Sequence, residues 1–264
     1  NKDFLNGEFS FTSGSNASVV NQGSIEADGY ILLAGRLVEN EGLLKAKSIF
    51  LAAGTEIVFD PRGYQRLLVS HEYGTTPYES AIRLGGVLDC FDEIFVDAGA
   101  GCLQVDACLT SDGGEVRLLA DEIQIRPEAR IIASSDANGG IVLIGGDYKG
   151  SNPLVPNAKR VWVGLGSLIE VSSKGRGNGG KIILWGDEAC IFAGSIFAEG
   201  GASGGNGGFV ETSSPNYLDV SGIVSAIAPQ GKPGTYLLDP CEVTISSGGT
   251  TAMGVCPAWP FGAL

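Results

Sequence analysis

The chain has 264 residues, of which 41 are glycine, and a formal net charge of −13 from 17 basic and 30 acidic residues. Nucleic acids and anionic membrane surfaces attract basic faces, so this balance argues against either as a partner. Because no apolar run is long enough to cross a bilayer, no membrane insertion is expected. The 44% hydrophobic and 18% charged content favours short strands joined by tight turns.

Residues 1–60 contain two short repeats. Residues 21–27 and 30–35 form the first, and residues 40–46 and 48–54 form the second, with Gly23 and Gly42 offset by 19 positions. Each repeat alternates apolar and polar residues, as half-buried strands do. We therefore predict amino-terminal β-helix coils here, with one more strand at 55–60.

Residues 61–85 interrupt this pattern with proline, glycine and tyrosine, which predicts a loop excursion from the rod. Loops on a rigid scaffold often carry binding residues, although these rings could equally cover the flank of the rod. A surface position is expected for the single histidine, which has no serine or cysteine motif beside it. The candidate binding residues are Tyr64, His71, Tyr73 and Tyr78.

The repeats are expected to resume over residues 86–245. A second loop is predicted at 147–159, where two prolines fall, and an irregular tail or truncated coil at 246–264. The predicted strands of the first half of this region are short segments, at residues 93–97, 102–105, 115–119, 122–125, 130–133 and 141–144.

A fixed period runs through the second half. Ile169, Ile196 and Ile223 follow one another at intervals of 27 residues. A period of this size is typical of stacked supersecondary units, and these units are too short for propeller blades. The sequence therefore predicts an all-β parallel β-helix of about ten layers, a rod on the order of 50 Å long.

The six cysteines contain no C-x-x-C pair, and the chain has one histidine as a further possible ligand, so no metal site is predicted. They are interpreted either as small apolar core residues or as disulfides between neighbouring coils. Cys90 and Cys108 lie 18 residues apart, close to one coil, and could stack at about 4.8 Å, within bridging distance. The six are Cys90, Cys102, Cys108, Cys190, Cys241 and Cys256.

Two glycine-rich segments resemble ligand motifs. Residues 175–182 approach a phosphate-binding loop, but a strand follows instead of a helix, and Ile182 replaces the hydroxyl that would bind Mg²⁺. Residues 200–208 lack the aspartate that each calcium repeat needs. Both are predicted to be turns between coils, and no cofactor is expected.

Acidic residues are the remaining candidates for catalysis. A β-helix lyase or hydrolase acting on acidic polysaccharide would need paired carboxylates or a calcium site on one exposed sheet. The acids here are scattered at strand ends and turns, which favours a solvated surface and a non-enzymatic protein. The carboxylates concerned are Asp89, Asp92, Glu93, Asp97 and Asp106.

Several segments in order resemble the filamentous haemagglutinin-like exoproteins of two-partner secretion. The resemblance covers residues 3–60 and 160–245 well and the middle loosely. Its motifs are at residues 3–7, 17–25, 37–42, 51–54, 179–185, 192–196, 204–211 and 234–240.

This resemblance implies a right-handed parallel β-helix, exported through an outer-membrane transporter barrel to the cell surface or the medium. It also implies a rigid adhesin segment that contacts a host-cell or glycan receptor, or the stalk of a contact-dependent toxin. The family's Asn-Pro secretion motifs are expected to precede Asn1. The six cysteines differ from the family, whose members are poor in cysteine.

Overall fold

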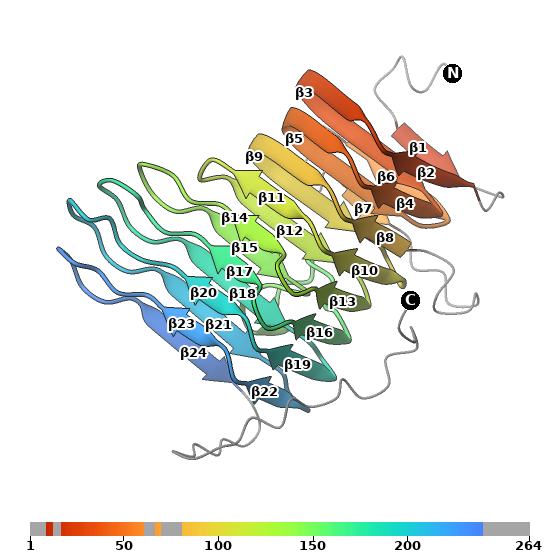
Figure 1. Cartoon of the computed structure of the whole chain (residues 1–264). Coiled ribbons are helices and arrows are strands. Elements are labelled where there is room, and N and C mark those ends of the chain that lie inside the picture. The colour runs from red at the N-terminus through yellow and green to blue at the C-terminus, as the bar shows by residue number, and fades with distance from the viewer. Residues whose placement is uncertain (1–8, 13–16, 61–66, 70–80, 240–264) are drawn as a thin grey trace.

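The computed structural model describes residues 9–12, 17–60, 67–69 and 81–239. These residues form a stack of parallel-stranded coils, a parallel β-helix, with strands running across the stack (Figure 1). The predicted tail at 246–264 lies outside the described residues. The only helical element in the described part is a short 3₁₀ turn, η1 (Tyr148–Gly150).

The first face of the β-helix is a sheet of eight strands, one from each coil, so the described chain makes eight coils. Seven spacings of about 4.8 Å give a stack roughly 34 Å high. The described residues thus form fewer coils than the ten layers predicted for the whole chain. Its strands are, in order, β2 (Ser18–Asn21), β4 (Leu37–Asn40), β8 (Ala81–Leu84), β10 (Cys102–Val105), β13 (Glu122–Ile125), β16 (Arg160–Val163), β19 (Ala189–Phe192) and β22 (Leu218–Val220).

The second and third faces are two parts of one 13-stranded sheet. In coils 1 to 3 one long strand runs through both parts: β3 (Ser24–Gly35), β5 (Leu43–Ala53) and β9 (Val87–Asp97). In coils 4 to 8 the second face has β11 (Cys108–Ser111), β14 (Arg130–Ile132), β17 (Leu168–Glu170), β20 (Ser195–Phe197) and β23 (Ile223–Ser225). The third has β12 (Glu115–Leu119), β15 (Ile141–Ile144), β18 (Lys181–Trp185), β21 (Phe209–Ser213) and β24 (Thr235–Asp239).

The core is a set of apolar rows inside the coils. A strand directs alternate side chains inward, and parallel pairing places each inward residue above its counterpart in the next coil. Leu103 of β10 thus lies between Ile82 and Ile123, and all three are fully buried. One coil could not bury these side chains alone, so the stacking of coils is the source of the core.

The 27-residue period is correct for one step and wrong for the next. Ile169 pairs with Ile196, but Ile196 pairs with Val224, so the offset there is 28. Ile223 instead faces outward and is 64% exposed. The cause is one extra residue in the corner between β20 and β21, because the offset between coils 6 and 7 is 27 at Ile169–Ile196 and already 28 at Lys181–Phe209.

A small antiparallel sheet covers the third face of the early coils. It consists of β1 (Phe9–Thr12), β6 (Glu56–Phe59) and β7 (Leu67–Val69), in the order β1-β6-β7. Its inner residues, such as Phe59, pack on Phe50 and Phe95 of β5 and β9. The strand predicted at 55–60 therefore exists but lies outside the coils, because an apolar outer row on the third face needs cover.

This arrangement also corrects the predicted excursion at 61–85. Residues Leu67–Val69 pair with β6, and Ala81–Leu84 are a regular strand of the first face between β4 and β10. The coil has therefore resumed by Ala81. Residues 61–66 and 70–80 lie outside the described residues.

Candidate functional site

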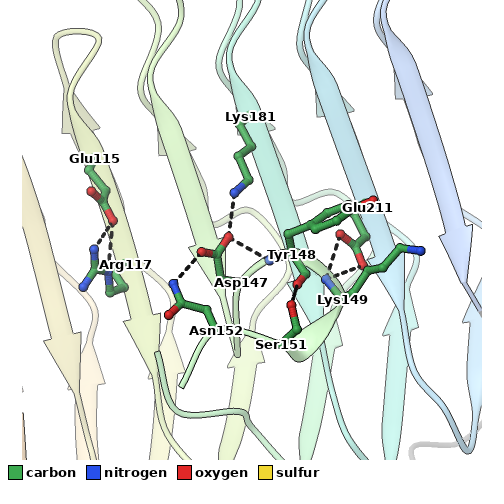
Figure 2. Close-up of polar contacts among 9 residues, drawn as sticks. All are labelled: Glu115, Arg117, Asp147, Tyr148, Lys149, Ser151, Asn152, Lys181 and Glu211. Atoms are coloured by element: carbon green, nitrogen blue, oxygen red, sulfur yellow. Dashed lines mark hydrogen bonds and ion pairs between the residues drawn. The ribbon is translucent and has the colours of Figure 1, made fainter. Parts of the chain in front are cut away.

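The four candidate binding residues, Tyr64, His71, Tyr73 and Tyr78, all lie outside the described residues. The second predicted loop, residues 147–159, is described, and it crosses the outer surface of the third face (Figure 2). We call this segment the clasp. Sequence reasoning placed a loop here, but it gave no indication that the loop is fastened to the sheet.

Asp147 begins the clasp directly after coil 5. Its carboxylate accepts hydrogen bonds from Lys181 Nζ at 2.6 Å, from the Tyr148 N–H at 2.7 Å and from Asn152 Nδ2 at 2.9 Å. Partial burial acts to raise the pKa of Asp147, but these donors outweigh it and the pKa is lowered. The ionised side chain therefore fixes the start of the clasp to β18 in coil 6.

The next contact reaches coil 7. The Lys149 N–H donates to the two carboxylate oxygens of Glu211 at 3.1 and 3.3 Å, and the Ser213 hydroxyl donates to the same group at 2.9 Å. Glu211 is fully buried, and burial is the main reason that its pKa is raised. Lys149 has a positive φ of 57°, in the left-handed region that residues other than glycine seldom adopt.

Apolar contacts complete the attachment. Tyr148 packs edge-on against Phe209, with ring centroids 5.8 Å apart. Gly150 lies against the Trp185 indole so closely that a Cβ there would be 2.3 Å from the ring. Leu143, Ile183 and Trp185 form a buried outer cluster of the third face at this point. The clasp thus has the same role here as the antiparallel sheet has over coils 1 to 3.

The outward side of the clasp is open to solvent. Tyr148 and Leu154 are each 45% exposed. The Lys149 ammonium lies 5.6 Å from the Tyr148 ring centroid and 3.7 Å from the Asp239 carboxylate. These groups can make apolar and hydrogen-bonding contacts with a partner, and none forms a nucleophile–base pair.

The glycine motif at 175–182 is a coil corner, as predicted. Each backbone N–H from Arg176 to Lys181 donates to an oxygen within the protein, that of Gly180 to Val171 of the same coil and the others to a neighbouring coil, so none is left to hold a phosphate. The same corner lies beside a shallow groove of about 520 Å³ that crosses coils 5 to 8. Gly140, Gly180, Gly208 and Gly234 lie on its floor, where a Cβ would fall 2.0–2.1 Å from a carbonyl oxygen of the coil before.

An asparagine ladder joins the successive corners, and sequence reasoning missed it. Asn138 Oδ1 accepts the Asn178 N–H at 2.9 Å, and Asn178 Oδ1 accepts the Asn206 N–H at 2.8 Å. The ladder ends where Asn206 Oδ1 accepts the Lys232 N–H at 2.9 Å. An asparagine directly before each Gly-Gly pair that precedes a strand is the signal that could have revealed it.

The predicted Cys90–Cys108 disulfide is not formed. Cys108 pairs with Val87, whereas Cys90 pairs with Ser111, so the two lie three positions apart along the strands. That offset is roughly 10 Å along the strand, beyond bridging distance. The coil step there is 21 residues rather than 18. Burial raises the pKa of Cys90, Cys102 and Cys190 to about 12, which suits core thiols.

The acidic candidates are not brought together as a catalytic pair. Asp89 makes an ion pair with Lys45, and Asp92 makes one with Lys47. Within the described part of the chain, no group of three or more His, Cys, Asp or Glu is placed to hold a metal ion. Nor does any described helix have the length and hydropathy of a membrane span.

One solved structure is similar to this chain over most of its length. The HMW1 secretion domain from Haemophilus influenzae matches with a TM-score of 0.66 and 26% sequence identity, over 90% of this chain and 72% of that chain. No protein-family model matches, and no curated protein matches in sequence. The match supports the relation to two-partner secretion exoproteins that the sequence motifs indicate, and the shared fold is a parallel β-helix.

Proposed function

We propose that this chain is part of a two-partner secretion exoprotein, carried through an outer-membrane transporter barrel to the outside of the cell. The observation that carries the proposal is the match of 90% of the chain to a secretion domain of the same fold. A stack of coils suits this route, because each coil adds only to its neighbour and folding can follow the chain as it emerges.

The proposed role outside the cell is adhesion without catalysis. The rod would act as a rigid spacer, and its loops at 61–80 and 147–159 would contact a host-cell or glycan receptor. Support comes from the exposed outer side of the clasp, and from the surface ion pairs that Asp89 and Asp92 make with lysines, as on a solvated face.

Loop replacement tests the adhesive role. Residues 70–80, between two described strands, are replaced by a short Gly-Ser turn, and binding of the purified protein to host cells and a glycan panel is measured. We expect binding to fall. The matched control is Leu165→Ser, since Leu165 is exposed in the corner between β16 and β17 and belongs to neither loop, so its change should leave binding intact.

Equal binding by the loop variant and the parent protein would contradict the loop assignment. Product release from any glycan on the panel would instead favour the polysaccharide lyase or hydrolase. A toxin domain in the same natural protein would make the rod a stalk, with adhesion secondary.

A further inference from the structure

We propose that the clasp couples coil 8 to coil 5, so that the last four coils open together rather than one at a time. In a simple solenoid each repeat contacts only its neighbours, and stability is a sum of nearest-neighbour terms. The clasp departs from that rule, because one segment that leaves coil 5 makes contacts with coils 6, 7 and 8.

The contacts follow the chain step by step. Asp147 bonds to Lys181 in coil 6, 34 residues later, and the Lys149 N–H bonds to Glu211 in coil 7, 62 residues later. The Lys149 ammonium then reaches Asp239 in coil 8, which is 239 − 149 = 90 residues later. A segment of three residues, Asp147 to Lys149, therefore joins coil 5 to coils 6, 7 and 8, and Figure 2 shows its bonds to Lys181 and Glu211.

The strength of the coupling lies in its buried part. The ion pair between Lys149 and Asp239 is half exposed on both sides and adds little by itself. The Lys149 N–H bond to buried Glu211 and the Asp147–Lys181 pair carry more, because losing either leaves a poorly hydrated partner behind. The Trp185 indole also bonds to Asp187, which holds Asn157 at the far end of the clasp.

The sequence separations also set the order in which the coils and the clasp form. The Lys149 N–H has no acceptor in coil 7 until Glu211 is in place, and the last contact of the clasp, with Asp239, forms only when coil 8 is in place. It therefore closes only after the coils that it fastens have formed, and it then opposes their fraying from the carboxyl-terminal edge. This inference concerns the folded rod and does not depend on the route of export.

Hydrogen exchange of the full chain, read by mass spectrometry, tests the coupling. Asp147→Ala weakens the clasp at coil 6, and we expect exchange to rise about tenfold in 147–159 and also in β24 of coil 8, with β10 of coil 4 unchanged. Asp106→Ala is the control, because it breaks an ion pair with Arg126 on another face between coils 4 and 5.

A reciprocal variant tests the same coupling from the other end. Tyr236→Ala removes a coil 8 side chain that packs on the core and bonds to Thr212, and exchange in the clasp should rise with it. If Asp147→Ala fails to fold, Lys181→Gln is the alternative variant, because it breaks the same ion pair by changing the residue on β18. Faster exchange confined to 147–159 in the Asp147 or Lys181 variant, with β24 unchanged, would overturn the proposal.

Discussion

The backbone N–H of Lys149 lies 3.1 Å from Oε1 of Glu211, a residue 62 positions later and fully buried. The contact joins the segment that follows β15 of coil 5 to β21 of coil 7. The contact explains why a glutamate can occupy the outer row of the third face, where Ile183 stands in the coil before.

Two substitutions of Glu211 should separate its hydrogen bonding from its charge. Glu211→Ala leaves the Lys149 N–H and the Ser213 hydroxyl without their acceptor, and should lower the free energy of unfolding by about 2–4 kcal/mol. Glu211→Gln keeps an acceptor and removes a buried charge, so its effect should be below about 1 kcal/mol at pH 7. Urea titration measures both, and equal losses would contradict this assignment.

Glycine is required at the coil corners because the backbones of neighbouring coils approach each other too closely there for a Cβ atom. A Cβ on Gly208 would lie 2.1 Å from the Gly180 carbonyl oxygen, so Gly208→Ala should cost about 1–3 kcal/mol or more. Gly23→Ala is the matched control, because nothing lies within 4 Å of its Cβ position. Thermal unfolding should show a lowered Tm for the first variant alone. Tolerance of alanine at Gly208 would mean that the corners are looser than described.

Asp97 should make stability fall as pH rises. Burial, with nearby Asp121 adding to it and the Gly99 N–H opposing it, raises the pKa of Asp97 from 3.8 to about 7. The folded state therefore binds this proton more tightly than the unfolded state, and the resulting stability is present below pH 3.8 and is lost up to about pH 7. The largest loss is about 4 kcal/mol, from three pKa units at about 1.4 kcal/mol each.

The Asp97→Asn variant checks this pH dependence. Asparagine keeps the acceptor for the Gly99 N–H, which Asp97 Oδ1 binds at 2.8 Å. Its stability relative to the parent protein should improve steadily between pH 4 and pH 8 in urea titrations. A difference that stays constant over this range would show that Asp97 titrates as it does in the unfolded chain.

The cysteines should differ sharply in reactivity. Cys90, Cys102 and Cys190 are buried with pKa values near 12, whereas Cys108 lies on the outer side of β11 and is partly exposed. Iodoacetamide at pH 8 should therefore label Cys108 first, and the buried three only after unfolding. Mass mapping of the labelled peptides gives the order. Early labelling of Cys190 would be inconsistent with its place in the core.

Strand positions were predictable because they depend on local alternation. The segments predicted at 102–105, 115–119, 122–125 and 141–144 coincide with β10, β12, β13 and β15. In β12 and β13 inward Val, Leu and Ile alternate with polar residues, β15 is apolar throughout, and glycine or aspartate marks the corners. The parallel β-helix follows from repeated units that cannot bury their apolar faces alone.

Register and long-range contacts were not predictable in the same way. One extra residue in a corner moved Ile223 from the interior to the surface, and a step of 21 rather than 18 residues separated Cys90 from Cys108. Corner lengths depend on backbone contacts between coils, such as Gly205 above Gly177 in the corner between β20 and β21, which no local pattern reveals. The clasp depends on partners 34 to 90 residues away, so its loop was predictable and its attachment was not.

Export of the natural full-length protein tests the central claim most directly. The protein is produced with and without its outer-membrane transporter barrel, and the amounts in the cells, on the cell surface and in the medium are compared. We predict that it reaches the surface or the medium only when the transporter is present. Equal amounts outside the cell without any such transporter would contradict the proposal that this β-helix is a two-partner secretion exoprotein.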